Sequence, residues 1–335
     1  MSAEGPRIAA VIPLYNGERF IEDALNSVFA QTLPPDEVIV VDDGSTDNGA
    51  AIVERLAAER TVTLLRKENG GQSSARNMGI RHTDCDLIAL LDQDDMWYPH
   101  HLEELVKPFL EKRFPPVGWV YSNLDEVDMK GRMIIRSTLR MLPFVQHPKI
   151  DLFGCLSTDM FVLPSSSLIS RSAFFDVGGF DEDLSGFEDD DLFLRLFRAG
   201  YDNIYIDQAL TKWRIFGGSA SFSPRMARSR MIYLRKLIAE YPDDETANRF
   251  YTRDLLVPRF QQWMIREYTQ ALRRGDKAQI ERALDDLVFL IRHSPNRRLR
   301  LIARLLPRAT RVMVAHPGLL RLSGATRPLI RRFLR

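Results

Sequence analysis

Three clusters of acidic residues stand where predicted secondary-structure elements begin or end. Residues 42–47 read Asp-Asp-Gly-Ser-Thr-Asp after one apolar segment, and residues 92–95 read Asp-Gln-Asp-Asp after another. Residues 188–191 read Glu-Asp-Asp-Asp before an amphipathic segment. In an open α/β sheet, ligands bind beyond the carboxyl ends of the strands. Carboxylates gathered at one such edge repel one another unless a positive group lies between them, and we expect a divalent cation to supply that charge.

The residue types favour a hard cation. Asp92-Gln93-Asp94 suits Mg²⁺ or Mn²⁺, which are held by one or two carboxylates together with the phosphates of a substrate. Zinc is not expected, because the two cysteines are isolated and His100-His101 are adjacent. Residues 69–73 lack the Lys-Ser/Thr that ends a phosphate loop. Taken alone, the cluster at 42–47 would also suit a turn followed by a helix N-cap.

The elements that must position these residues alternate along the first half of the chain. With 45% hydrophobic and 27% charged residues, the composition is that of a globular protein and excludes a disordered, collagenous or coiled-coil chain. Continuous apolar runs alternating with amphipathic segments predict a mostly parallel sheet covered by helices on both faces. Strands are expected at 8–14, 37–41, 61–66 and 86–91, and helices at 19–31, 47–59 and 74–81.

The rest of the chain changes character twice. Strands at 119–124 and 166–170, a helix at 189–199 and an extended segment at 203–206 are expected in the middle. A helix pair follows at 259–272 and 277–291, and four prolines (295, 307, 317 and 328) should cut the remainder into short pieces. We therefore expect three parts: an α/β domain over 1–224, a helical annex over 225–294 and an Arg-rich tail over 295–335.

Five motifs, in this order and spacing, resemble the family 2 inverting glycosyltransferases of GT-A fold over roughly residues 7–220. They are Pro13-Leu14-Tyr15-Asn16, Val41–Asp47, Gly71–Gly79, Asp92–Asp95, and Gly178–Glu182 followed by Glu188-Asp189. The resemblance implies a Rossmann-like, mostly parallel central sheet, here with a C-terminal helical annex. It also implies a metal-dependent enzyme that moves a sugar from a nucleoside-diphosphate sugar, most simply a UDP-sugar, to a hydroxyl group.

The resemblance assigns a role to each matching position on the donor side. Tyr15 stacks on the base and Asp43 accepts a ring N–H, with Pro13 and Asp42 beside them. Arg76 lies near the nucleotide, Asp92 reaches the ribose, and Asp94 binds the metal. Plain core packing is the structural alternative for Tyr15.

On the acceptor side, Asp189 resembles the catalytic base, with Glu188 beside it. Acidic residues at a helix N-terminus are the structural alternative for this pair. Many members of the family carry a histidine in the segment matching 213–219, where it helps to hold the metal or the diphosphate. This chain departs from that pattern, because the matching residue is Phe216. Asp94 is thus the one expected protein ligand, and Arg214 is expected to neutralise the leaving diphosphate. His82, His100 and His101 are expected to be surface or helix-end residues.

The expected acceptor is a glycan or a lipid-linked molecule used to build cell-surface polysaccharide or lipopolysaccharide. The sugar specificity should lie in 123–128 and 157–167. One alternative is a non-catalytic nucleotide-sugar-binding or scaffold protein of the same fold, which the intact Asp43, Asp94 and Asp189 argue against. A nucleotidyltransferase is a second, but residues 13–19 lack its Gly-rich basic signature.

Charge is distributed unevenly along the chain. After Asp286 there are 12 Arg and no acidic residue, although the whole chain carries only +1, so the first 286 residues carry −11. On a helical wheel, one face carries Arg297, Arg300, Arg304 and Arg308. Another face carries Leu299, Ile302 and Leu306. Such a helix suits an anionic membrane surface, or docking on the acidic body.

Nucleic acid is not an expected partner, because the tail has a single aromatic residue and the body is acidic. No secretory signal and no membrane-spanning segment are expected from the hydropathy pattern. We therefore expect a cytoplasmic protein held peripherally at the inner face of the cell membrane.

Overall fold

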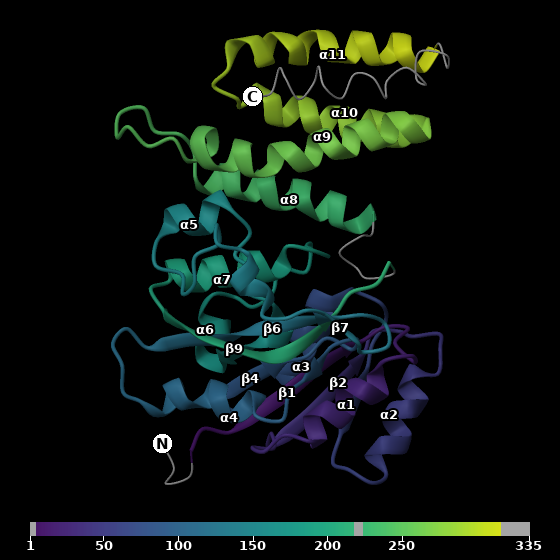
Figure 1. Cartoon of the computed structure of the whole chain (residues 1–335), viewed down its shortest axis with the longest axis vertical. Helices are drawn as coiled ribbons and strands as arrows, with labels where there is room; N and C mark the ends of the chain where they lie inside the picture. The colour runs from purple at the N-terminus through teal and green to yellow at the C-terminus, as the bar shows by residue number, and fades with distance from the viewer. Residues whose placement is uncertain (1–4, 218–223, 316–335) are drawn as a thin grey trace. The chain divides into compact units, whose positions relative to one another are not determined.

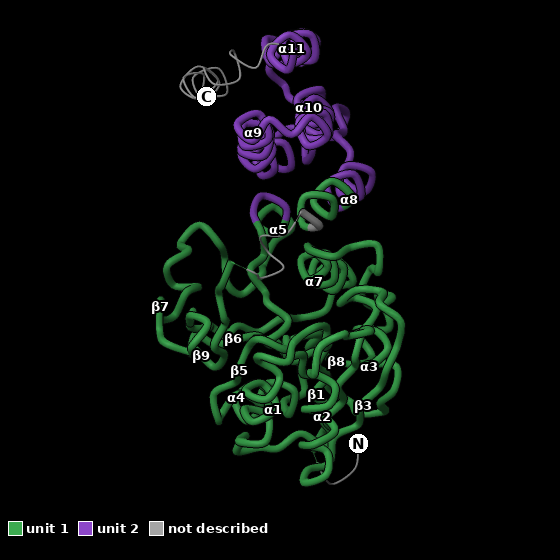
Figure 2. The backbone as a smooth tube through the Cα atoms, turned by 90° about the vertical axis from the view of Figure 1, so that its right-hand side faces the viewer, with its two compact units in different colours: residues 1–155, 159–232 green, residues 156–158, 233–335 purple. Residues whose placement is uncertain are grey.

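The computed structural model describes residues 5–217 and 224–315. The chain divides into two compact units, which Figure 2 colours separately. Unit 1 comprises residues 1–155 and 159–232, and unit 2 comprises residues 156–158 and 233–335. The boundaries expected at 224 and 294 stay predictions.

Unit 1 is built on one mixed sheet. In sequence order its described strands are β1 (Ile8–Leu14), β2 (Glu37–Asp42), β3 (Thr63–Arg66), β4 (Leu87–Leu90), β5 (Met96–Trp97), β6 (Val117–Val127), β7 (Met133–Ile135), β8 (Ser167–Ser170) and β9 (Asp202–Arg214). Their order across the sheet is β3-β2-β1-β4-β8-β6-β9-β5, with β7 paired to β6.

The first four strands are parallel, as expected, and begin and end close to the predicted residues. β1 and β4 are buried along their whole length, which explains their unbroken apolar sequences. β8 runs antiparallel to both β4 and β6, so β6 points in the same direction as β4. The carboxyl ends of β1, β2, β4 and β6 therefore lie at one edge of the sheet.

Helices cover both faces of this sheet (Figure 1). The described helices of unit 1 are α1 (Ile21–Phe29), α2 (Gly49–Ala57), α3 (Gln72–His82), α4 (His101–Val106), α5 (Leu152–Ser157), α6 (Arg171–Asp176) and α7 (Glu188–Arg198). α1 and α4 pack on one face in the main apolar core, and Ala75 of α3 packs on Ile39 and Val41 on the other. α3 lies very close to the sheet, because a Cβ at Gly79 would stand 2.5 Å from Val11 Cγ1.

The middle strands differ from the expectation in length. β9 continues for eight residues beyond Ile206, to Arg214, because it pairs in parallel with β6 up to the last residue of that strand, Val127. β7 forms a hairpin with the last residues of β6, where Val127 faces Met133. Both features extend the sheet toward the edge that carries the acidic clusters.

Unit 2 is helical. It contains the second half of α8 (Pro224–Glu240), the π-helical turn Thr252–Leu256, α9 (Val257–Arg274), α10 (Lys277–Arg292) and α11 (Arg297–Ala315). Gly275, with φ +71°, ends α9, and the Asp276 side chain caps α10 by accepting from the Gln279 N–H.

The expectation that prolines divide the basic tail is wrong at Pro307. α11 continues through this residue, with Ala303 buried before it and Thr310 buried after it. The Tyr268 and Thr310 hydroxyls are hydrogen-bonded at 2.6 Å, so α9 holds the helix after the proline, while burial of Ala303 holds it before. Pro317 and Pro328 lie outside the described residues. No helix in the described part of the chain is long and apolar enough to cross a membrane.

Candidate active site

Tyr15 stands at the carboxyl end of β1 with its side chain open to solvent. The residue is 41% exposed, so it is not a core residue, whereas Pro13 is buried within the strand. Gln93 holds the Tyr15 backbone by accepting from its N–H and donating to its carbonyl. The aromatic ring is therefore free to stack on a flat ligand while its backbone is fixed to the loop after β4.

The two carboxylates at the end of β2 have different surroundings. Asp43 accepts from the Gly70 and Gly71 N–H groups and from Lys67 Nζ, so it anchors the loop between β3 and α3. Asp42 accepts from Ser45 N through Oδ1, and its Oδ2 lies 3.9 Å from Arg66 Nε. Of the two, Asp42 has an oxygen without a close hydrogen-bond donor within the described structure.

The loops that follow β1 and β2 are joined to each other. The Asn16 side chain, on a residue with φ +49°, accepts from the N–H and hydroxyl of Thr46. Glu18 accepts from the backbone and side-chain N–H groups of Asn48. The edge formed by these loops is thus ordered by the chain itself.

The loop after β4 brings three carboxylates together. Ser165 accepts the Asp92 N–H, and the Asp95 carboxylate accepts the Arg214 N–H. Burial and the neighbouring Asp92 carboxylate raise the pKa of Asp94 to about 6. Burial and the carboxylates of Asp94 and Asp92 also raise the pKa of Asp95 well above its usual value. This loop therefore carries more negative charge than its surroundings stabilise.

The chemistry of Asp94 fits a magnesium or manganese ion. Within the described residues there is no group of three or more His, Cys, Asp or Glu side chains placed to hold a metal. Mg²⁺ commonly binds through one or two carboxylates plus substrate phosphates. A buried carboxylate with a raised pKa is stabilised in its charged form by a bound cation.

Arg214 lies beside this loop, but its guanidinium is already occupied. It donates to the Asp94 carbonyl, the Met129 carbonyl and the Asp23 carboxylate, and is 3% exposed. Its guanidinium carbon is 4.6 Å from the centre of the Phe20 ring, which Phe216 also contacts. These contacts position the Asp94–Asp95 segment. Neutralisation of a diphosphate by Arg214 stays a prediction.

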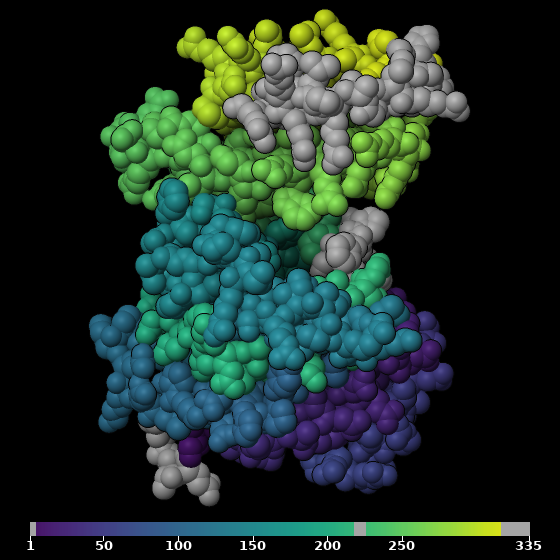
Figure 3. Space-filling view, in the orientation of Figure 1, coloured from purple at the N-terminus to yellow at the C-terminus, as the bar shows by residue number. Residues whose placement is uncertain are grey.

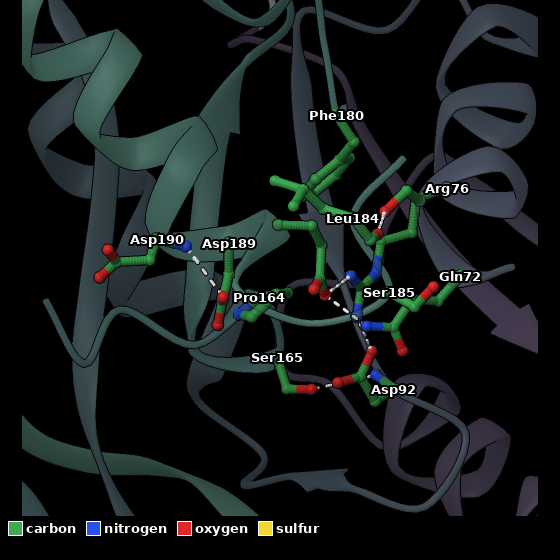
Figure 4. Close-up of polar contacts among 12 residues, drawn as sticks. Gln72, Arg76, Asp92, Pro164, Ser165, Phe180, Leu184, Ser185, Asp189 and Asp190 are labelled. Carbon is green, nitrogen blue, oxygen red and sulfur yellow. Dashed lines mark hydrogen bonds and ion pairs between the residues drawn. The ribbon is translucent and has the colours of Figure 1, made fainter. Parts of the chain in front are cut away.

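Helix α7 presents Glu188 and Asp189 in its first turn. The helix begins after Phe187, whose φ is +62°, and acidic residues are favoured at this positive end of the helix dipole. Burial, followed by the carboxylates of Glu188, Asp159 and Asp190, raises the pKa of Asp189 well above its usual value. Figure 4 shows Asp189 accepting from the Asp190 backbone N–H. A carboxylate of this kind has the raised proton affinity that a general base needs.

Arg76 connects the donor loop to α7. It lies on α3, is 1% exposed, and donates through Nη2 to Asp92 and through Nη1 to Glu188 (Figure 4). Gln72, one turn earlier, donates to the same Glu188 oxygen. Although burial opposes its charge, these two carboxylates raise the pKa of Arg76 above its ordinary value. Between Asp92 of the second acidic cluster and Glu188 of the third, the chain itself thus supplies one positive charge, the Arg76 guanidinium.

The three histidines expected at the surface or at helix ends differ in burial. His82 ends α3 and is exposed, and His100 is exposed just before α4. His101 begins α4 but is buried and stacked on Trp97 at 4.5 Å, and burial lowers its pKa to about 3. It packs as a neutral core residue, so the expectation of a surface position is wrong for His101, whereas a helix-end position is confirmed.

Sequence reasoning missed four polar residues that hold the site, namely Lys67, Gln72, Gln93 and Ser165. Gln72 and Gln93 stand inside motifs that were recognised, so their place in the motif was an available signal. Lys67 and Ser165 offered no local pattern, because their partners are brought to them by the sheet.

The chain is similar to known glycosyltransferases in sequence. The model of the family described as "Glycosyl transferase family 2" matches residues 9–177. An uncharacterized glycosyltransferase of Rickettsia bellii (strain RML369-C) is 32% identical over 216 residues, which cover 61% of this chain and 29% of that protein. The putative glycosyltransferase EpsE of Bacillus subtilis (strain 168) is 30% identical over 220 residues, which cover 63% and 73% respectively. The chain thus spans about a third of the length of the first Rickettsia relatives that it matches.

Solved structures share its fold. S. aureus TarS 1–349 in complex with UDP-GlcNAc superposes with a TM-score of 0.63 at 17% identity, covering 96% of this chain and 92% of that one. The mannosyltransferase PcManGT from Pyrobaculum calidifontis, in complex with GDP-Man and Mn²⁺, superposes with a TM-score of 0.53 at 19% identity, covering 97% and 87%.

Proposed function

Because this chain belongs to glycosyl transferase family 2 and has the GT-A fold, we propose that it is a metal-dependent inverting enzyme. Its donor is a nucleoside-diphosphate sugar, and its acceptor is a hydroxyl group of a glycan or lipid-linked molecule. The products serve cell-surface polysaccharide or lipopolysaccharide assembly.

One observation supports this proposal above the others. Arg76 joins Asp92, in the loop that carries Asp94, to Glu188, the residue before Asp189. Arg76 therefore joins the loop that carries the candidate metal ligand to the helix that carries the candidate base. A transfer reaction needs such a link, because donor and acceptor must be held next to each other.

Asp189 acts as the base in the proposed reaction. The acceptor oxygen attacks the anomeric carbon as its proton passes to the Asp189 carboxylate, and the bond from that carbon to the diphosphate oxygen breaks with its electron pair. A single displacement of this kind inverts the anomeric centre. The raised pKa of Asp189 increases its affinity for the proton, and base catalysis of this type contributes about 10²–10⁴-fold.

Asp94 is the proposed ligand of Mn²⁺ or Mg²⁺. When bound there, such an ion stabilises the negative charge that develops on the leaving diphosphate. The Mn²⁺ in the PcManGT structure supports this proposal. The chain's own contribution is to hold Asp94 through the Arg214 contact to its carbonyl.

Tyr15 and Asp42 are the proposed contacts to the base of the nucleotide. The exposed ring of Tyr15 stacks on the base. The resemblance implied that Asp43 accepts from the ring N–H of the base. This carboxylate already accepts three hydrogen bonds from the loop before α3. We therefore assign that contact to Asp42. A UDP-sugar is the proposed donor, in keeping with the UDP-GlcNAc bound to TarS.

The proposed location is the inner face of the cell membrane, with the Arg-rich segment 295–335 attracted to anionic lipid. The structure places Leu299 of the predicted apolar stripe in the unit 2 core. On α11, Leu301, Leu305 and Val312 are instead exposed, with Arg304 and Arg308 also exposed nearby. Attraction of such arginines to anionic lipid weakens as salt is added.

A screen of nucleotide-sugars tests the function. Melting temperature is measured with each sugar, with and without Mn²⁺, and released nucleoside diphosphate is measured in parallel. We expect one nucleotide-sugar to raise the melting temperature in a Mn²⁺-dependent manner and to be turned over slowly by water. Binding without any turnover, even with acceptor glycolipids added, would favour the non-catalytic alternative.

A further inference from the structure

Unit 1 carries a surface that the proposed reaction does not use. We propose that the segment Lys130–Phe153, called here the rim segment, rests on an anionic lipid bilayer and holds the active-site edge at the membrane. This inference deepens the proposed function and rests on it, because a lipid-linked acceptor would be presented from the same bilayer.

The rim segment exposes large apolar side chains in unusual number. Of the sixteen that are exposed in the described part of the chain, seven belong to it: Met133, Ile134, Ile135, Met141, Phe144, Ile150 and Phe153. Met141, Phe144, Ile150 and Phe153 are each 64–68% exposed. Single exposed apolar residues are ordinary, but their concentration in one segment marks an interaction surface.

The charge of the rim segment selects an anionic partner. It contains five basic residues and one acidic residue, Asp151, whereas the first 286 residues together carry −11. Arg132 and Arg140 are paired with Asp128 and Asp207, and Lys149 is buried, so the charge offered to a partner is that of two of the five. Lys130 and Arg136 are exposed among the apolar side chains. Apolar side chains interspersed with basic ones match the boundary between acyl chains and anionic headgroups.

The rim segment is fixed to unit 1 and is not a loose loop. β7 pairs with β6, and the N–H groups of Ser137 and Leu139 donate to Asp125 and Asn123 of β6. Further along, the Lys149 N–H donates to the Asn203 side chain. In Figure 3 the blue-to-teal middle part of the chain lies on the face of unit 1 turned to the viewer.

The β7 hairpin places the first part of the rim segment beside the candidate active site, whereas Lys149 is held at Asn203, near the amino end of β9. β7 pairs with the carboxyl end of β6, which lies at the same edge of the sheet as Asp42 and Asp92. Arg214 connects this hairpin to the metal loop by donating to both the Met129 and the Asp94 carbonyls. A bilayer in contact with the rim segment would therefore lie next to the place where the acceptor must enter.

Vesicle flotation of the full chain tests the inference. The vesicles contain phosphatidylcholine with or without phosphatidylglycerol, at low and high salt. The variant carries Phe144→Ser and Phe153→Ser, both at exposed sites. The matched control carries Leu110→Ser and Phe114→Ser, which are 57% and 98% exposed and precede the other end of β6. A third protein carries Leu301→Ser and Leu305→Ser on α11.

We expect the rim variant to bind phosphatidylglycerol vesicles about tenfold or more weakly than the parent, because two aromatic rings no longer enter the interface. The control should bind like the parent. The inference is overturned if the parent does not float, or if the rim variant floats like the parent, whether or not the α11 variant does. It is also overturned if the rim substitutions convert a dimer to a monomer without changing flotation, since a second copy would then cover this surface.

Donor binding, followed by the Mn²⁺-dependent melting shift, is measured on the same proteins and should be equal in all of them. A parent that floats but binds no nucleotide-sugar would contradict the proposed function and leave the lipid contact standing. A parent that binds donor but does not float would contradict the lipid contact and leave the proposed function standing.

Discussion

Arg76 Nη1 and Glu188 Oε1 form a buried ion pair at 2.8 Å, which joins helix α3 to the first residue of helix α7. The second terminal nitrogen of Arg76 binds Asp92 in the loop after β4. One cation thus compensates two carboxylates that the fold brings to the same edge of the sheet. The position of the proposed base depends on this pair, because Asp189 is the next residue of α7.

Replacing Arg76 by Met should destabilise unit 1 and reduce transfer. Breaking a buried pair leaves an uncompensated charge and costs about 3–5 kcal/mol. The free energy of unfolding is measured by urea denaturation. The matched control is Arg81→Met on the same helix, since Arg81 is exposed and 3.7 Å from Glu182. Equal stability of the two variants would show that Arg76 does not hold the site together.

Asp94→Asn should abolish Mn²⁺-dependent donor binding and leave the fold intact. The carboxylate is the single proposed protein ligand of the ion, and an amide is a much weaker ligand for a hard cation. Calorimetric titration with donor and Mn²⁺ measures the loss. Asp84→Asn, at an exposed position before the other end of β4, serves as the control. Donor binding of parental strength in Asp94→Asn would remove this residue from the metal site.

The pH dependence of donor binding should report on the same carboxylate. Because burial and Asp92 raise the pKa of Asp94 to about 6, Mn²⁺-dependent affinity should fall roughly tenfold per pH unit below that value. The contribution of Asp94 to the free energy of unfolding changes with pH in the opposite direction. A raised pKa gives stability that is present at low pH and is lost as pH rises from about 4 to about 6. At pH 7, the Asp94→Asn variant should therefore be more stable than the parent, with a free energy of unfolding about 1–3 kcal/mol larger. A pH-independent difference between the two proteins would contradict the assignment.

Asp189→Asn should bind donor normally and lose transfer. The residue is proposed to act on the acceptor hydroxyl, so kcat should fall by about 10²–10⁴ while the dissociation constant for the donor is unchanged. Asp183→Asn, at an exposed position before α7, controls for the loss of one negative charge in this region. Turnover close to that of the parent would exclude Asp189 as the base.

Leu299→Ala should lower the stability of unit 2, whereas Leu301→Ala should not. Leu299 is 5% exposed and Leu301 is 57% exposed on the same helix. Removing a buried leucine side chain costs about 2–5 kcal/mol, and an exposed one costs much less. Thermal denaturation of the two variants measures the difference. If Leu299→Ala melts like the parent, α11 does not pack in solution as it does in this structure.

The parallel half of the sheet could be predicted because its strands are buried on both faces. The residues of β1 are apolar without interruption and were expected at 8–14, where the strand lies. The motif positions also told which residues would follow the strands, so Asp92 and Glu188 were expected near one edge. What joins them was not predictable, because an arginine in an amphipathic helix is usually solvated, and only the packing of α3 on the sheet buries Arg76.

The remaining differences arise from tertiary contacts that local patterns do not record. β9 is long because β6 offers it a parallel partner over most of its length. α11 passes through Pro307 because side chains on both sides of the proline are packed against neighbouring helices. In each case the local propensity points one way and packing prevails.

The hydrogen bonds that Thr46 donates to Asn16 and Asn48 donates to Glu18 have a consequence for ligand affinity. Ordering a flexible loop on binding costs about 1–2 kcal/mol of conformational entropy for each residue fixed. Here the two loops are immobilised against each other before any nucleotide arrives, so that cost is part of folding and is absent from the association step. Donor capture at this edge should accordingly be preorganised, and the measured affinity should not be reduced by a loop-ordering cost.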